Sequence, residues 1–152
     1  VLIELGPFVS DTLLVLSAWA TEARVQLISY GDATVEADPR GLREALLNLV
    51  ANGIEATPPG GAVVVEVRAS GDGAEIVVRD TGRGMPAETL ARVGTPFFTT
   101  REDGTGLGVV LARSVIAQHG GSLRYESEPG RGTTVKAVLP GRLVVGASAA
   151  AS

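Results

Sequence analysis

Apolar residues recur along the chain at two spacings, three or four residues apart in some segments and every second residue in others. The first spacing predicts three main helices, over residues 8–19, 39–57 and 106–118, and a short one over residues 85–93. Asp38 and the proline after it predict the start of the second main helix, because Asp caps helices and proline is tolerated in their first turn. The second spacing predicts strands.

Six segments rich in β-branched residues predict a sheet. They are residues 25–30, 33–37, 62–70, 74–80, 122–126 and 133–139. Gly-rich turns after the third and the fifth segments predict two hairpins. Together with the helices, these strands predict an α/β fold, a two-layer sandwich with about three main helices on one face of a mixed, mostly antiparallel sheet.

The composition fits one globular domain over residues 1–140, followed by a flexible tail over residues 141–152. Of the 152 residues 45% are apolar, and the net charge of −4 without a basic run argues against a nucleic-acid partner. The absence of cysteine excludes disulfides and thiolate metal sites. Glu4 and Asp11 interrupt the apolar N-terminus, which argues against a membrane span there. Because the chain begins at Val1 within an apolar pattern, we expect it to be part of a longer protein.

A polar stripe runs along the second predicted helix. Glu44, Asn48 and Asn52 lie at successive i+4 positions, so they share one face of this helix. A solvated face is the simplest explanation of such a stripe. Asn is a poor helix former, however, and two amides within a helix are better explained if their oxygens coordinate Mg²⁺ together with phosphate oxygens.

The sequence DTGRG at residues 80–84 follows a predicted strand. Asp80 at the strand end could accept a hydrogen bond from the exocyclic amine of adenine, while Gly82 and Gly84 would let the backbone approach the base. An ordinary Asp-Thr-Gly turn is the alternative explanation.

The sequence TPFFTTREDGTGLG at residues 95–108 joins a loop to a Gly-rich helix start. It lacks the lysine of a Walker motif and the third glycine of a dinucleotide-binding motif. The free N–H groups of such a helix start attract anions, and residues 94–104 have the composition of a lid that closes over a ligand. The candidate nucleotide-binding residues in this segment are Thr99, Arg101, Thr105, Gly106, Leu107 and Gly108.

Four motifs in this order carry a resemblance to a known family: ALLNLVANGIEA, DTGRGM, TPFFTT and GTGLGV. They resemble the asparagine box, first glycine box, phenylalanine box and second glycine box of the catalytic, ATP-binding domain of bacterial sensor histidine kinases. That domain belongs to the superfamily shared with DNA gyrase, HSP90 and MutL, and its fold is the Bergerat-type sandwich. The sequences PFFTT and EATPPGG resemble the nitrogen-regulation type of these kinases.

The resemblance implies ATP and Mg²⁺ as cofactors and assigns roles to the selected residues. Asn52 would be the magnesium ligand, Asn48 would support phosphate and metal, and Asp80 would bind the adenine amine. Thr133 or Thr134 would reach adenine through water. The glycines would shape the pocket.

Glu44 and Asn48 are the candidate catalytic residues. In gyrase-like relatives a glutamate that activates water stands four residues before the metal-binding asparagine, and here Asn48 holds that place. Loss of this base fits a kinase that avoids hydrolysing its ATP. Gly53 replaces the usual Ala, and Glu55 stands where many relatives carry a phosphate-binding cation, for which Arg101 could substitute.

His119, the only histidine, follows the third main helix and is expected to cap or pack against the helix end, not to accept phosphate. The resemblance therefore implies a cytoplasmic catalytic domain that phosphorylates a histidine on a separate dimerisation domain, with a response regulator downstream. Whether the parent protein is anchored in a membrane stays open. A non-catalytic nucleotide-sensing or interaction module and a gyrase-like ATPase are the alternatives.

Overall fold

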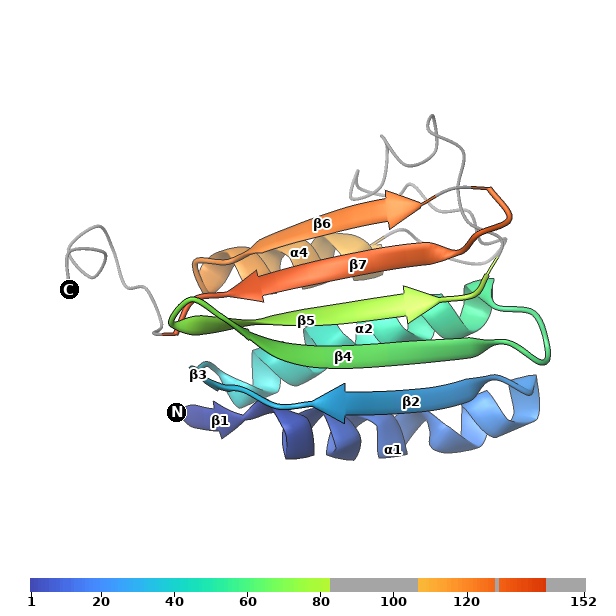
Figure 1. Cartoon of the computed structure of the whole chain (residues 1–152), viewed down its shortest axis with the longest axis horizontal. Coiled ribbons are helices and arrows are strands. Elements are labelled where there is room, and N and C mark those ends of the chain that lie inside the picture. Colours follow the sequence, from blue (N-terminus) through green and yellow to red (C-terminus); the bar gives the residue numbers. More distant parts are fainter. Residues whose placement is uncertain (83–106, 128, 142–152) are drawn as a thin grey trace.

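The computed structural model describes residues 1–82, 107–127 and 129–141, and for residues 107–110 it describes only the backbone. In this part of the chain three helices lie on one face of a five-stranded sheet (Figure 1), so the predicted two-layer α/β sandwich is confirmed. The elements in chain order are β1 (Leu2–Glu4), α1 (Leu5–Ala23), β2 (Gln26–Gly31), β3 (Thr34–Glu36), α2 (Pro39–Ala56), β4 (Ala62–Ser70), β5 (Gly73–Asp80), α4 (Leu107–Gln118), β6 (Ser122–Ser127) and β7 (Thr133–Leu139).

The sheet has the strand order β2-β4-β5-β7-β6. β2 runs parallel to β4, and the other neighbouring strands are antiparallel, so the prediction of a mixed, mostly antiparallel sheet is also confirmed. Both predicted hairpins are present, as β4–β5 and β6–β7. Each hairpin pairs strands that are close in sequence, which is why local turn signals were sufficient to predict it.

The first part of the chain differs from the sequence-based expectation. α1 begins at Leu5, before the predicted start, and the three residues preceding it form β1, which pairs with β3. β2 and β3 follow one another without pairing, since β2 pairs with β4 and β3 pairs with β1. The turn between them is tied to α1. Asp32 Oδ1 accepts hydrogen bonds from the backbone amides of Gly6 at 2.7 Å and Ala33 at 2.9 Å.

The second helix matches its prediction. Asp38 caps α2 by accepting a hydrogen bond from the backbone amide of Arg40 at 3.2 Å. At the other end the Thr57 hydroxyl donates to the Gly53 carbonyl at 2.7 Å. The buried face of α2 packs on the sheet and on α1 and α4. Its buried residues are Leu42, Ala45, Leu46, Leu49, Val50, Gly53 and Ile54.

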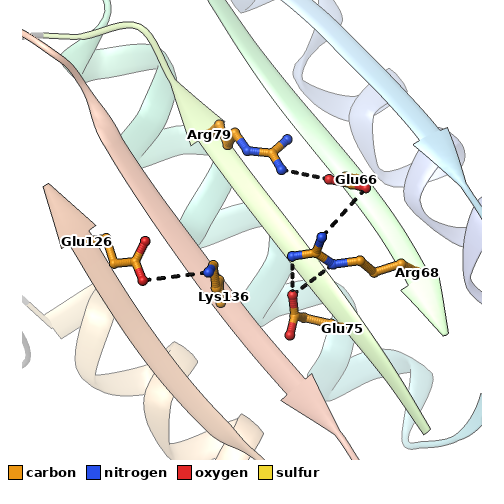
Figure 2. Close-up of polar contacts among 6 residues, drawn as sticks. All are labelled: Glu66, Arg68, Glu75, Arg79, Glu126 and Lys136. Atoms are coloured by element: carbon orange, nitrogen blue, oxygen red, sulfur yellow. Dashed lines mark hydrogen bonds and ion pairs between the residues drawn. The ribbon is translucent and has the colours of Figure 1, made fainter. Parts of the chain in front are cut away.

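The side of the sheet away from the helices carries a layer of charged side chains. Figure 2 shows Arg79 donating to Glu66, with its Nη2 at 2.7 Å from Glu66 Oε1, and Arg68 donating to Glu75 through two of its nitrogens. Val77 lies between Glu66 and Lys136 in the strand register, and it is 0% exposed. Long charged side chains therefore cover an apolar residue and present charged groups to the solvent on this face.

These contacts predict an acid-sensitive ion pair on the outer face. The hydrogen bond from Arg79, together with the charge of Arg68, holds the pKa of Glu66 below its ordinary value although burial opposes this. Because the folded-state pKa is depressed, the pair stabilises the fold above the ordinary glutamate pKa and loses this effect as the pH falls through the lower, folded-state value. An Arg79→Gln substitution should raise the pKa of Glu66, measured by carboxyl-carbon NMR titration.

The matched control for this substitution is Lys136→Gln, because Lys136 pairs with Glu126 at 3.5 Å on the same face. It should leave the titration of Glu66 essentially unchanged. An unaltered Glu66 pKa in the Arg79 variant would show that the ion pair does not form in solution.

Candidate functional site

The candidate site lies at one end of the sheet, where β5 ends and β7 begins, at the right of Figure 1. α2 reaches the same end. A Cβ built on Gly53 would lie 3.2 Å from Val63 Cγ2 and 3.6 Å from Asp80 Cβ, and one built on Gly82 would overlap the Ala56 carbonyl oxygen. The C-terminal half of α2 thus packs directly against the last residue of β5 and the turn after it.

Asp80 is half-buried and its carboxylate is held by the backbone. Its Oδ1 atom accepts hydrogen bonds from the amides of Gly82 at 2.9 Å and Thr133 at 3.2 Å. The bond to Gly82 is the turn contact expected of an ordinary Asp-Thr-Gly sequence, whereas the bond to Thr133 crosses to another strand. The carboxylate is therefore oriented by two rigid donors.

The strand register separates the two threonine candidates. Thr133 lies opposite Asp80, and Thr134 lies opposite Arg79. Because directly opposite residues of antiparallel strands point to the same face, Thr133 shares the side of Asp80 while Thr134 shares the charged outer face. Of the two, Thr133 is placed to act together with Asp80.

The β6–β7 turn adds a residue that the sequence reasoning missed. The Ser127 hydroxyl donates to the Gly132 carbonyl at 3.0 Å and lies 2.9 Å from the Thr133 hydroxyl. Gly132 has φ +83°, and a Cβ on it would overlap the Asp80 carbonyl oxygen. The hairpin register, which pairs Ser127 with Thr133, is the signal that could have identified Ser127.

The amide stripe on α2 is only partly accessible. Asn48 and Asn52 are half-buried, whereas Glu44 and Glu55 are exposed to solvent. Asn52 directly precedes Gly53, the residue at which α2 packs against Asp80. The two amides therefore lie on the half of the helix that reaches the site, and Glu44 lies one helical turn further from it.

Part of the predicted site lies outside the described residues. This holds for the predicted short helix over residues 85–93 and for the predicted lid over residues 94–104. It also holds for the candidate residues Gly84, Thr99, Arg101, Thr105 and Gly106. Leu107 and Gly108 are the first two residues of α4, and only the backbone of these two residues is described.

His119 is 4% exposed and ties α4 to α2. Its Nε2 accepts a hydrogen bond from the backbone amide of Asp38 at 3.0 Å, so this nitrogen is unprotonated. Its Nδ1 then donates to the carbonyl of Val115 at 2.8 Å. Gly120, with φ +77°, ends the helix. The prediction that His119 packs against the helix end is confirmed.

The chain belongs to the histidine kinase-, DNA gyrase B-, and HSP90-like ATPase family, whose sequence pattern matches residues 37–143. Sporulation kinase C of Bacillus subtilis (strain 168) is 41% identical over 106 residues, which cover 70% of this chain and 25% of that protein. Sensor histidine kinase ZraS of Escherichia coli (strain K12) is 36% identical over 141 residues, which cover 91% of this chain and 30% of that protein. The chain thus spans a quarter to a third of these relatives.

Solved structures agree with this family. The mycobacterial sensor histidine kinase MprB matches with a TM-score of 0.81 and 29% identity, over 95% of this chain and 99% of that one. A nucleotide-free catalytic domain of histidine kinase ThkA matches with a TM-score of 0.84 and 25% identity, over 93% and 95% of the two chains. The resemblance to sensor histidine kinase catalytic domains is confirmed. Among the helices described, none is long and apolar enough to cross a membrane.

The position of His119 predicts a purely structural role. Replacing it with alanine removes the acceptor for the Asp38 amide and leaves space between α4 and α2, which should lower the free energy of unfolding by about 1–3 kcal/mol. Chemical denaturation measures this loss. Gln118→Ala at the exposed end of the same helix is the control and should change stability little. Equal stabilities of the two variants would refute the tie between the helices.

Proposed function

We propose that this chain is the ATP-binding catalytic domain of a sensor histidine kinase, and that it transfers the γ-phosphate of ATP to a histidine on a separate dimerisation domain of the parent protein. The observation that carries the proposal is the Asp80 carboxylate, held by two backbone amides beside the amide stripe of α2. The family and the named relatives support it. A response regulator would receive the phosphate next, and the domain would act in the cytoplasm.

Adenine recognition is assigned to Asp80 and Thr133. A carboxylate is an acceptor only, so it favours a base edge that carries an amine over one that carries a carbonyl. Gly82 and Gly132 fit this role because side chains at these positions would overlap neighbouring backbone oxygens. The glycines thus let the neighbouring backbone segments pack closely around Asp80 and add no side chains of their own. We therefore assign the contact with the base to the Asp80 carboxylate.

Phosphate and metal binding is assigned to the amide stripe and to the start of α4. Asn52 and Asn48 offer amide oxygens, which are suitable ligands for Mg²⁺. Bound Mg²⁺ would neutralise charge on the phosphates. The N-terminus of α4 at Leu107 and Gly108 offers backbone amides to phosphate oxygens. The residues before it that we assign to the phosphates are Thr99, Arg101, Thr105 and Gly106, with Gly84 beside the base.

Glu44 is an exposed carboxylate one turn before Asn48, and Asn48 itself cannot remove a proton from water. We therefore assign no efficient water-activating base to α2. The absence of such a base on this helix favours a domain that keeps ATP intact until an acceptor histidine is presented, in contrast to a gyrase-like ATPase.

The first test of the proposal is phosphate transfer. The chain, incubated with γ-labelled ATP and Mg²⁺, should label a dimerisation domain of the same parent but neither itself nor a variant of that domain whose acceptor histidine is replaced by glutamine. Label on His119 of the chain would overturn the assignment. Binding of ATP without any transfer would favour a nucleotide-sensing module, and steady phosphate release by the chain alone would favour an ATPase.

The second test concerns the metal. If Asn52 ligates Mg²⁺, Asn52→Ala should weaken Mg-ATP binding by about ten- to a hundredfold, the equivalent of losing one interaction with a charged group. Metal-free ATP binding should change much less. Calorimetry with and without Mg²⁺ measures both, with Arg40→Gln at the exposed start of α2 as the control. Equal losses in the two conditions would remove Asn52 from the metal site.

A further inference from the structure

The hydroxyl groups of Ser127 and Thr133 belong to a short series of hydrogen bonds in which each group has a defined donor or acceptor role. Ser127 Oγ lies 3.0 Å from the Gly132 carbonyl oxygen and 2.9 Å from Thr133 Oγ1. A carbonyl oxygen only accepts, so the single hydroxyl proton of Ser127 is donated to Gly132. The bond between the two hydroxyls must then be donated by Thr133.

This direction leaves Thr133 without a proton for a ligand. Its hydroxyl proton points to Ser127, and its backbone N–H donates to Asp80 Oδ1 at 3.2 Å. What Thr133 Oγ1 offers to a ligand is therefore a lone pair. Asp80 is also an acceptor, so the two residues that the proposed function assigns to the base have the same polarity.

We propose that Ser127 is a positioning residue for nucleotide selectivity: it fixes the polarity of the Thr133 hydroxyl, so that the site accepts hydrogen bonds from a 6-amino purine and disfavours a 6-oxo purine. This inference rests on the proposed function, in which Asp80 and Thr133 face the base. It adds that their discrimination depends on a serine from the neighbouring strand.

The residues around the two hydroxyls favour donation from Thr133 to Ser127 and from Ser127 to Gly132. Ser127 and Thr133 are half-buried and directly paired in the β6–β7 register. Gly132 is buried with φ +83°, and its backbone lies against the backbone of Asp80, so its carbonyl cannot easily turn away from Ser127. If Ser127 donated to Thr133 instead, the Gly132 carbonyl would lose the Ser127 proton. Acceptors without a donor in partly buried positions are unfavourable.

Removing the Ser127 hydroxyl should therefore change the chemistry of Thr133 without removing Thr133. In a Ser127→Ala variant the Thr133 hydroxyl loses its acceptor and can rotate. It could then donate its proton to the carbonyl oxygen at position 6 of hypoxanthine. The variant should lose selectivity for adenine more than it loses affinity for nucleotides as a class.

The experiment compares ATP with ITP, which carries a carbonyl in place of the 6-amine. Calorimetry on the whole chain with Mg²⁺ gives the ratio of the two affinities for the wild type, Ser127→Ala and Ser127→Thr. We expect the ratio to fall about three- to tenfold in Ser127→Ala, in line with one altered hydrogen bond. Ser127→Thr retains a hydroxyl and should preserve the ratio.

A second background tests whether Ser127 acts through Thr133. In Thr133→Val the hydroxyl is absent, so adding Ser127→Ala should leave the ATP-to-ITP ratio unchanged. Thermal unfolding of each variant checks that the fold is intact. A parallel fall of ATP and ITP affinity in Ser127→Ala, with the ratio preserved, would reduce Ser127 to a structural residue and overturn the inference.

The same measurements separate this inference from the proposed function. If the wild-type chain binds ATP and ITP equally and Ser127→Ala changes neither, the inference is wrong while nucleotide binding stands. If the wild-type chain binds no nucleotide, both the inference and the proposed function are wrong.

Discussion

The two hydrogen bonds that backbone amides donate to Asp80 are the contacts on which the site depends. They link the end of β5 to its own turn through Gly82 and to the first residue of β7, Thr133. A partly buried carboxylate is costly unless donors meet its charge, and here the donors belong to the backbone. The position of the Thr133 amide follows from the sheet register and that of the Gly82 amide from the turn after β5, and neither depends on a side-chain rotamer. A shift between β5 and β7 would therefore remove a donor and also misplace the carboxylate that we assign to adenine recognition.

Glycines determine how closely the other elements approach this carboxylate. Gly53 lets α2 pack on Val63 beside Asp80, Gly82 lets the turn pass under the end of α2, and Gly132 brings the β6–β7 turn against the Asp80 backbone. The cost of a glycine within α2 is about 1 kcal/mol of helix stability, and it is offset where a closer helix packs on the sheet. The same approach carries the amide stripe of α2 to the candidate site.

What could be predicted from the sequence was mostly local. The Asp38 cap, the two hairpins and the glycine that ends α4 depend on residues that are neighbours in the chain. The parallel pairing of β2 with β4 and the pairing of β1 with β3 depend on contacts between distant segments, for which turn signals carry no information. Asp80 was selected as a candidate by its motif. Ser127 was not selected, because the role that we propose for it depends on the strand register and on the direction of a hydroxyl proton.

The last two residues of β5 show why the register also separates two kinds of charge. Arg79 and Asp80 point to opposite faces of the sheet. Arg79 pairs with Glu66 on the outer face, where the Glu66 side chain is still 18% exposed and water can replace a lost partner. Asp80 turns to the helix-covered side, where amides of the fold itself donate to its carboxylate. A one-residue slip would exchange the two and place a cation where the proposed adenine site needs an acceptor. The buried residues that fix the register of β5, Ile76 and Val78, therefore also keep the Asp80 carboxylate in place.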